Sequence, residues 1–463
     1  MALIESFSGV RGIYGKDLTE SVAIRYAHSY VSFLRSKTGK NSLKVVIGMD
    51  SRPSGARIMD HILDIIDANF IKVGILPTPA IELAVRHFNA DGGIIITASH
   101  NEPFWNGFKF LNPDGSILNE KDMALVIKNS KSLANFHKIQ DRNVIEKHDE
   151  ALRKYSDFVL ETVGKENIEN IRSSGQKIII DPNGGAGIIA KNMLEKAGIK
   201  VVAVNMDYGE FSRQVEPTED SMIYLKNIID ESKADFAAGF DCDADRVEIL
   251  MQNGQFLSGN YILALTVDEI LSKIRNPKGQ IVVVNDATSN VVRDVADKHG
   301  ARIKEVEVGE TNAVEEMKRC KSVIGGEGSS GGAIIFPSKC RDGILTLFTV
   351  LSYVAKKGHK LQKLIEQFPK YFEVRGKIEF GSKKHDGIKK FIKNYYSRKK
   401  FEIRETGGIK GGLKIIPSRN SFVWVRASKT ESGIFRIIAE SDKKEEAEKL
   451  LKEAVEIFNK ANA

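Results

Sequence analysis

Short apolar runs that end in polar or glycine-rich turns recur along most of the chain. The first run of each group is rich in valine and isoleucine, which is typical of buried strands. A helix-like stretch follows, then a second apolar run, another helix-like stretch, and a third run with a conspicuous loop. Strands that alternate with helical patterns of ~10–15 residues predict a mainly parallel α/β sheet. The pattern occurs three times, with first runs at 45–50, 177–183 and 281–286, second runs at 71–75, 198–202 and 300–304, and loops at 97–101, 241–246 and 326–332.

The chain of 463 residues is too long for a single hydrophobic core, so several domains are expected. The three loops would share one cleft if the three strand groups converge. Residues from about 370 onward break the pattern and predict a smaller domain, which ends in a charged helix at 443–459 with apolar positions that suit packing on a sheet. We therefore predict three similar mixed-sheet α/β domains and a smaller C-terminal α+β domain, divided as 1–148, 149–253, 254–368 and 369–463.

The composition is that of an ordinary globular protein, with 42% hydrophobic and 28% charged residues. No apolar run approaches the ~18–20 residues that a membrane span needs, and the N-terminal residues lack the basic and apolar regions of a secretory signal. Three cysteines, an odd number without metal-ligand spacing, indicate a reducing compartment: Cys242, Cys320 and Cys340. We expect a cytoplasmic protein that does not bind a membrane.

The formal charge is +8, and basic residues cluster at 383–384, 389–390 and 398–400. Such clusters occur in nucleic-acid-binding proteins, but no nucleic-acid-binding motif accompanies them here. We interpret them as a solvated, lysine-rich surface that also attracts anionic small molecules. The expected partner is therefore a small molecule and not a nucleic acid.

The first loop presents a serine, a histidine and an asparagine together at the end of a buried strand, in the segment 94–101. An open α/β sheet places its chemistry at such a strand end. Ser99 and His100 are therefore candidate catalytic residues, and Lys109 follows after a turn-rich loop. The alternative is structural, because serine, asparagine and histidine also cap and turn strand ends.

The second loop carries three carboxylates, Asp241, Asp243 and Asp245, and closes with Arg246. Carboxylates at alternate positions share one face if the backbone stays extended, and three of them repel one another strongly unless a cation neutralises them. Hard oxygen ligands on a short loop suit Mg²⁺. A calcium EF-hand is excluded, since the sixth loop position is Arg246 where glycine is required and the twelfth is Gln252 where glutamate is required. A solvated acidic turn is the remaining alternative.

The third loop, at 326–331, matches the dinucleotide fingerprint G-x-G-x-x-G. The fingerprint requires a helix after the loop, whereas the chain continues with a short apolar strand-like run at 333–337, so we reject that interpretation. Glu327 and Ser329 are instead candidate ligands for sugar hydroxyls, and Arg341 is a candidate anion contact. A flexible turn explains the glycines alone.

Two further segments combine basic and small residues. One follows an apolar strand-like run near the C-terminus and forms a candidate phosphate cradle from Arg426, Ser428, Lys429 and Thr430. A surface hairpin with a salt bridge is the alternative there. Near the N-terminus, Arg11 lies between glycines and is a further candidate phosphate contact.

Taken together, these motifs resemble those of the α-D-phosphohexomutase family, which includes phosphoglucomutase, phosphomannomutase and phosphoglucosamine mutase. Segment 97–101 resembles the family's phosphoserine loop, and 241–246 resembles its D-G-D-A-D-R metal loop with Cys242 in place of the glycine. Segment 326–332 resembles its sugar-binding loop, and 426–431 resembles its phosphate-binding R-P-S-G-T-E-P loop. The matches follow the family order and span nearly the whole chain.

The resemblance implies four domains around a central cleft and an isomerase that exchanges the 1- and 6-phosphates of a hexose. A phosphoserine at Ser99 would give its phosphoryl group to the sugar phosphate, and the resulting hexose 1,6-bisphosphate, both intermediate and activator, would turn round before returning its other group. One Mg²⁺ per chain would offset the developing charge. The expected roles are catalysis for Ser99, His100, Lys109 and Arg11, metal binding for Ser99, Asp241, Asp243 and Asp245, and substrate binding for Arg246, Glu327, Ser329, Arg341, Arg426, Ser428, Lys429 and Thr430.

The chain departs from the family pattern at several positions. Glu102 replaces the usual proline, Lys429 stands where glycine or asparagine is common, Ser432 replaces proline, and Gly433 belongs to a one-residue insertion. The sugar loop ends in two glycines, at 331–332, where many bacterial relatives have Gly-His; the double-glycine form resembles archaeal members. We expect a monomer or homodimer that acts on glucosamine phosphate, with mannose or glucose phosphate as alternative substrates. A serine- and metal-dependent sugar phosphatase is the competing activity.

Overall fold

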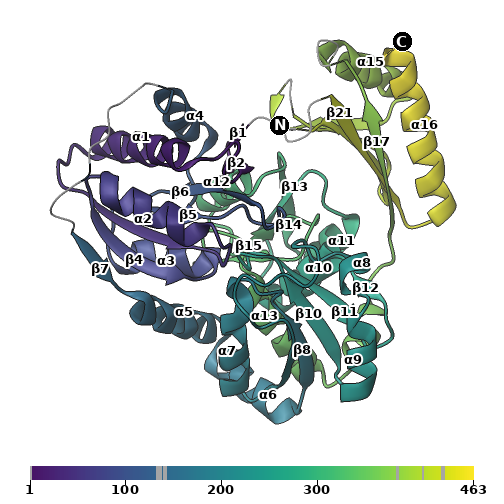
Figure 1. Ribbon diagram of the computed structural model, residues 1–463. Helices are drawn as coiled ribbons and strands as arrows, with labels where there is room; N and C mark the ends of the chain where they lie inside the picture. Colours follow the sequence, from purple (N-terminus) through teal and green to yellow (C-terminus); the bar gives the residue numbers. More distant parts are fainter. Residues whose placement is uncertain are drawn as a thin grey trace. The chain divides into compact units, whose positions relative to one another are not determined.

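The computed structural model describes residues 3–131, 138, 143–381, 385–408, 411–428 and 433–462 (Figure 1). The chain divides into two compact units, each built from two stretches of sequence. The first unit comprises Met1–Ser258 and Ser330–Leu364, and the second comprises Gly259–Ser329 and Ile365–Ala463. In each unit the second stretch of sequence is separated from the first by a stretch that belongs to the other unit.

One parallel strand arrangement occurs three times, twice in the first unit and once in the second. In each group the first strand lies between the second and the third and pairs in parallel with both. The three α/β groups predicted from the sequence are therefore confirmed. Their first, second and third strands are β3 (Lys44–Met49), β4 (Asn69–Ile75) and β5 (Gly92–Ile96), then β8 (Lys177–Asp181), β9 (Lys200–Ala203) and β10 (Phe236–Phe240), then β13 (Ile281–Asn285), β14 (Arg302–Val306) and β15 (Ile324–Gly326).

The sheets of the first unit are mixed, as predicted. β6 (Trp105–Leu111) pairs antiparallel with β5, and β11 (Val247–Met251) pairs antiparallel with β10. Each third strand thus has an antiparallel neighbour immediately after its functional loop. The other strands of this unit are β1 (Ile4–Ser6), β2 (Gly9–Ile13), β7 (Val144–Glu146), β12 (Phe256–Leu257) and β16 (Ala333–Ile335).

Helices cover both faces of the first sheet. Tyr30 of α1, Ile62 of α2 and Val126 of α4 enter one core with alternate residues of β3, β5 and β6. On the opposite face α3 packs so closely that a Cβ atom at Gly48 would lie only 2.7 Å from Ile81 Cδ1. Within the described residues, no helix is both long enough and apolar enough to cross a membrane. The helices are α1 (Glu20–Thr38), α2 (Gly55–Ile65), α3 (Thr78–His87), α4 (Glu120–Asn129), α5 (His148–Val163), α6 (Lys165–Ser174), the 3₁₀ helix η1 (Ala186–Ile189), α7 (Ala190–Lys196), α8 (Glu219–Met222), α9 (Leu225–Ser232), α10 (Gly259–Ser272), α11 (Asn290–Lys298), α12 (Glu310–Cys320), α13 (Gly343–Lys357), α14 (Leu361–Ile365), α15 (His385–Arg398) and α16 (Lys444–Asn462).

The C-terminal part of the second unit is an antiparallel sheet with two helices packed on it, which agrees with the predicted α+β domain. Ile388 and Ile392 of α15 and Leu450 and Phe458 of α16 share one core with the strands. The charged helix predicted at 443–459 is α16. The strand order is β17 (Phe372–Glu379), β21 (Ile434–Ser441), β20 (Ser421–Ala427), β19 (Leu413–Ser418) and β18 (Glu402–Glu405).

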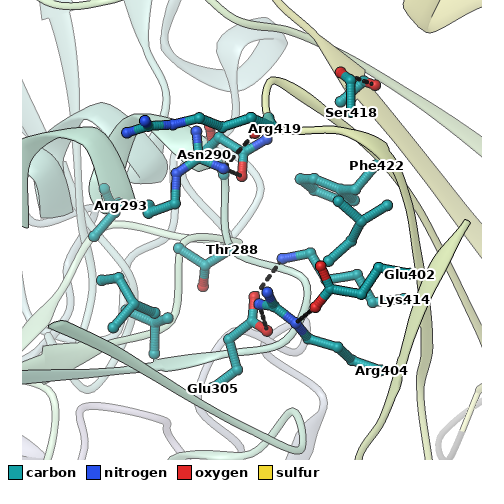
Figure 2. A pocket seen from close by; sticks show the side chains of 16 residues that line it. Thr288, Asn290, Arg293, Glu305, Glu402, Arg404, Lys414, Ser418, Arg419 and Phe422 are labelled. Carbon is teal, nitrogen blue, oxygen red and sulfur yellow. Dashed lines mark hydrogen bonds and ion pairs between the residues drawn. The ribbon is translucent and has the colours of Figure 1, made fainter. Parts of the chain in front are cut away.

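Charge pairs join this sheet to the third strand group within the second unit. Glu305 of β14 accepts from Lys414 Nζ at 2.5 Å and from Arg404 Nη1 at 3.0 Å, beside a cavity of about 450 Å³ (Figure 2). The Lys414 ammonium also lies 4.2 Å from the centroid of the Phe422 ring. The pairs in Figure 2 show that the basic side chains Lys414 and Arg404 around this cavity are neutralised by protein carboxylates.

Glu440 of β21 is a buried carboxylate at the same junction. Its Oε1 accepts the backbone N–H of Asn290 at 2.8 Å, at the start of α11, while its Oε2 has no hydrogen-bond partner among the described residues. Burial raises the pKa of Glu440 to about 7. Between about pH 4.5 and 7, Glu440 therefore binds more protons in the folded protein than in the unfolded chain. The free energy of unfolding therefore falls as the pH rises through that range.

We expect Glu440→Gln to remove this decline, because the amide oxygen still accepts from Asn290 and no charge has to be buried. Thermal unfolding midpoints measured from about pH 5 to 8 should fall with pH in the native protein and stay more nearly level in the variant. Glu445→Gln, at an exposed position of α16, is the control and should keep the native slope. Equal slopes for the native protein and Glu440→Gln would contradict the assignment.

Candidate active site

Ser99 lies in the turn that directly follows β5. Its φ is +52°, in the left-handed region that a non-glycine residue rarely adopts, and the residue is only 2% exposed. The Ser99 backbone N–H donates to Thr97 Oγ1 at 2.8 Å, and Ser99 Oγ donates to Asp241 Oδ2 at 3.4 Å. The turn therefore aims the hydroxyl at the aspartate loop, 142 positions later in the chain.

The three aspartates of that loop converge inside the first unit. One carboxylate oxygen from each of Asp241, Asp243 and Asp245 lies within 4.8 Å of the others, and all three are buried. Alternate carboxylates would share one face on an extended backbone, but here the backbone turns, with Ala244 at a φ of +50°. The N-terminus of α13 packs against this turn, where the Gly343 N–H donates to Ala244 O at 3.2 Å. The carboxylates therefore meet because the backbone bends.

The donor set fits a small divalent cation. Asp243 Oδ1 is buried and has no hydrogen-bond partner within the described part of the chain. Asp243 Oδ2 accepts from Thr78 Oγ1 at 2.6 Å and from Lys109 Nζ at 2.8 Å. Lys109 Nζ also donates to Asp245 Oδ2 at 2.9 Å. Buried carboxylate oxygens that face one another are the hard ligands that Mg²⁺ takes, and the ammonium of Lys109 supplies part of the same positive charge.

Charge crowding shifts two of the acids in opposite directions. Burial and the neighbouring Asp245 and Asp243 raise the pKa of Asp241 well above its ordinary value. Burial alone would raise the pKa of Asp245 as well, but Arg341 and Lys109 lower it below the usual range. A proton on Asp241 would relieve part of the repulsion, and a divalent cation bound by the three carboxylates would relieve it as well.

Arg341 and Arg246 bring further positive charge to the cluster. Arg341 Nη2 lies 3.4 Å from both carboxylate oxygens of Asp245, and its Nη1 donates to Ser330 Oγ at 3.1 Å. Arg246 Nε lies 3.8 Å from Asp245 Oδ1, and its Nη1 pairs with Glu216 Oε1 at 2.6 Å. Both predicted substrate-binding arginines of the first unit thus lie beside the aspartates.

Arg11 and His100 lie at the Ser99 turn. Arg11 Nη1 donates to Asn101 Oδ1 at 2.9 Å. Burial, with the neighbouring Arg246, lowers the pKa of Arg11 to about 10, so this guanidinium is still charged near pH 7. Arg246 and burial also lower the pKa of His100 well below its ordinary value. These surroundings therefore disfavour the protonated form of the His100 imidazole.

The predicted sugar ligands lie in the second unit. Glu327 Oε1 accepts from the Gly309 N–H at 2.8 Å and from Asn285 Nδ2 at 3.1 Å. This carboxylate therefore also holds its own loop against the ends of β13 and β14. Ser329, two residues later, is exposed.

The predicted phosphate cradle lies in the same unit, at the end of β20. Arg426 is buried, and its Nη2 pairs with Glu307 Oε1 at 2.9 Å, so a phosphate would compete with this carboxylate. Ser428 directly follows the strand. Lys429 and Thr430 lie outside the described residues.

Sequence reasoning missed the side chains that hold these loops. Asp50 and Arg52 follow β3 and contact the Ser99 turn, and Thr78 contacts Asp243 from the start of α3. Arg213 pairs with Asp181 at 2.5 Å, next to the aspartate loop. One signal was available, since an aspartate ends or directly follows the first strand of all three strand groups, as Asp50, Asp181 and Asp286.

Three family matches cover most of the chain. Residues 5–135, 153–254 and 258–372 match the alpha/beta/alpha domains I, II and III described as phosphoglucomutase/phosphomannomutase. The matches follow one another in the order of the domains, and all three predicted chemical loops before residue 372 fall within them.

Full-length relatives carry similar names. The chain is 33% identical to a phosphoglucomutase/phosphomannomutase of Thermococcus kodakarensis, with 98% of each chain covered. It is 28% identical to a phosphoglucosamine/phosphogalactosamine mutase of Sulfurisphaera tokodaii, with 97% of each covered. A crystal structure of a phosphoglucomutase/phosphomannomutase family protein from Burkholderia thailandensis matches 99% of this chain and 97% of its own with a TM-score of 0.81, at 19% identity, which shows that the folds agree.

The aspartate cluster predicts a measurable affinity for a divalent cation. We expect calorimetry with Mg²⁺ to show one site in the native protein, and Asp243→Asn to weaken binding by roughly a hundredfold or more, since even the outer partners of a metal site change affinity about 10–100-fold. Asp207→Asn, at an exposed position of the same domain, is the control. Unchanged binding in Asp243→Asn would contradict the assignment.

Lys109 provides a second arm of this experiment. Its ammonium donates to Asp243 and Asp245, where it competes with a cation for the same oxygens. We expect Lys109→Met to bind Mg²⁺ more tightly than the unphosphorylated native protein. Weaker binding would show that Lys109 supports the site and does not compete for it.

Proposed function

Because the chain belongs to the phosphoglucomutase/phosphomannomutase family and is a phosphohexomutase of the isomerase class, we propose that it exchanges the 1- and 6-phosphates of a hexose by way of phosphorylated Ser99. The observation that carries this proposal is the Ser99 hydroxyl, 3.4 Å from Asp241 in the buried cluster that also holds Lys109. A hydroxyl nucleophile, carboxylates that can hold a divalent cation and a buried ammonium are what phosphoryl transfer requires.

In the proposed cycle, phosphorylated Ser99 gives its phosphoryl group to the free hydroxyl of a hexose monophosphate. The bond from phosphorus to Ser99 Oγ breaks, and a hexose 1,6-bisphosphate forms. The bisphosphate turns round and returns its other phosphoryl group to Ser99 Oγ, which restores the enzyme and leaves the phosphate in a new position. One Mg²⁺ per chain, held by the three aspartates and a phosphoryl oxygen, would offset the charge that develops during transfer.

The other residues of the first unit serve orientation and proton transfer in this proposal. Lys109 already faces the carboxylates, so its ammonium is placed to hold phosphoryl oxygens once a cation binds the aspartates. Arg11, Arg246 and Arg341 supply guanidinium groups that suit phosphate. His100, the direct neighbour of Ser99 in the turn, would take the proton of the attacking hydroxyl.

Sugar recognition is proposed for the second unit. Glu327 and Ser329 would bind the 3- and 4-hydroxyls in both orientations of the intermediate, because a carboxylate accepts two hydroxyl donors whichever way the ring faces. Arg426, Ser428, Lys429 and Thr430 would hold the phosphate that is not being transferred. That phosphate would have to displace Glu307 from Arg426.

Glucosamine phosphate is the proposed substrate. The names of the relatives indicate which other hexose phosphates are alternative substrates. The relative at 28% identity is named for glucosamine and galactosamine phosphates, and the one at 33% identity for glucose and mannose phosphates. A panel of glucosamine, mannose and glucose 1-phosphates, each assayed with Mg²⁺ and a trace of the matching 1,6-bisphosphate, compares them directly. We expect the highest kcat/KM with glucosamine 1-phosphate, and a higher value with another sugar would replace that assignment.

We expect Ser99→Ala to lower turnover by at least about a thousandfold, because the phosphoryl group then has no carrier. The coupled assay scores hexose 6-phosphate against free phosphate, and intact-mass measurement locates the phosphoryl group in the native enzyme. Ser130→Ala, at another buried serine of the same domain, is the control and should match the native enzyme. A phosphoryl group on a different residue, or release of free phosphate only, would refute the proposal.

Glu327→Gln separates the charge of this residue from its structural role. The amide keeps an oxygen that can accept from Gly309 and Asn285, so the loop should retain its shape. Loss of charged hydrogen bonds of ~1.5–3 kcal/mol to the sugar should lower kcat/KM roughly ten- to a hundredfold. Near-native efficiency on every sugar of the panel would show that Glu327 only holds its loop.

A further inference from the structure

The guanidinium of Arg52 is buried at the centre of the Ser99 turn. Its side chain has no exposed surface. An arginine suits this place, because its planar fork presents five donors in fixed directions. It donates to four backbone carbonyl oxygens of the turn, from Nη2 to Ser99 at 2.7 Å and Asn101 at 2.5 Å, and from Nη1 to Glu102 at 2.6 Å and Trp105 at 3.1 Å.

Asp50 anchors Arg52 and also reaches Ser99 by a second route. Asp50 Oδ2 accepts from Arg52 Nε at 3.0 Å, and Oδ1 accepts from the Arg52 backbone N–H at 3.0 Å. Asp50 Oδ2 further accepts from Thr97 Oγ1 at 2.6 Å, and that hydroxyl accepts the Ser99 N–H at 2.8 Å. Both backbone polar groups of Ser99, its N–H and its C=O, therefore lead back to one buried carboxylate.

This network surrounds the strained residue of the turn. A left-handed non-glycine residue persists only where its surroundings enforce the conformation, and Ser99 has a φ of +52°. The direction of Ser99 Oγ toward Asp241 depends on that conformation. A buried ion pair is by itself weak evidence for a role in stability. The informative observation is that the Asp50–Arg52 pair is hydrogen-bonded to the backbone of Ser99, directly and through Thr97.

We propose that Arg52, with Asp50 and Thr97, is a positioning group for phosphoryl transfer, which holds the Ser99 backbone so that Oγ faces the aspartate cluster. Arg52 acts through the backbone, since each of its three guanidinium nitrogens is engaged by protein oxygens. The inference rests on the proposed function, because it assumes that Ser99 carries the phosphoryl group.

The second strand group contains a comparable pair at the aspartate loop. Arg213 Nε pairs with Asp181 Oδ2 at 2.5 Å, and Arg213 Nη2 donates to Phe240 O at 2.8 Å, one residue before Asp241. Asp181 ends the first strand of its group, and Asp50 directly follows the first strand of the other. Arg213 is therefore a matched comparison for Arg52. Its buried guanidinium donates to the backbone at the aspartate loop and makes no hydrogen bond to the Ser99 turn among the described residues.

Arg52→Lys tests the proposal, because lysine keeps the positive charge and loses the fork. The measurement is the single-turnover rate at which glucose 1,6-bisphosphate phosphorylates Ser99, followed by intact mass at saturating Mg²⁺, together with kcat, KM and the thermal unfolding midpoint. We expect phosphorylation and kcat to slow about a hundredfold, as a misplacement of about 1 Å causes, while KM for the sugar phosphate changes little. Arg213→Lys should instead raise the Mg²⁺ concentration needed for half-maximal rate, and Arg35→Lys, at the surface, should match the native enzyme.

Thr97→Val keeps the test decisive if Arg52→Lys does not fold, because it breaks the second route without removing a charge. It should slow phosphorylation of Ser99 about tenfold with KM unchanged. A native phosphorylation rate in folded Arg52→Lys or in Thr97→Val would overturn the inference, and so would a rise in KM that accounts for the whole loss of kcat/KM. If the native protein takes up no phosphoryl group on Ser99, the proposed function itself fails. If the native protein is phosphorylated on Ser99 and Arg52→Lys is phosphorylated equally fast, only the inference about Arg52 fails.

Discussion

Repulsion among three buried carboxylates is the constraint on which the first unit depends. Oxygens of the aspartate loop lie within 4.8 Å of one another, where water cannot screen them. The chain offsets the repulsion with Lys109 from β6, Arg341 from the segment before α13 and a hydroxyl from Thr78 of α3. These groups come from distant parts of the sequence, so the cluster is complete only when both sheets of the unit and the segment after residue 330 have come together. The same crowding makes the site receptive to a divalent cation.

The first strand of each α/β group helps to hold the functional loop of that group in place. The first strand of each group ends at or next to a polar side chain that reaches the loop after the third strand. Asp50 reaches the Ser99 turn through Thr97, Asp181 reaches the aspartate loop through Arg213, and Asn285 donates to Glu327. Since the first and third strands are parallel neighbours in every group, their carboxyl ends meet at one edge of the sheet. The topology therefore supplies each functional loop with a ready support.

The sequence could predict the strand groups, the loops and the C-terminal helix, because periodicity and motif chemistry are properties of neighbouring residues. It could not predict the supports, because those depend on contacts across long stretches of chain. Arg52 lies 47 positions before Ser99 and has the local pattern of an ordinary turn residue. Backbone N–H groups of Thr78 and Gly343, both far away in the sequence, donate to the bent aspartate loop, so the alternating acids alone could not predict how it is held. Likewise nothing near Arg426 in the sequence shows that Glu307 pairs with it.

The discontinuity of the first unit has a consequence for folding during synthesis. Helix α13 is buried along most of its length and is fastened to the rest of the unit by Tyr155, which donates to Asp342 at its N-terminus, and by Gln176, which donates to Leu351 O. A ribosome that has translated residues 1–258 has not yet made this helix, because the segment 259–329 of the second unit comes first. At about 5–20 residues per second, the nascent chain waits for several seconds with the apolar faces that α13 covers exposed to solvent. Apolar surface that is exposed in this way makes a nascent chain prone to aggregation until α13 has been made.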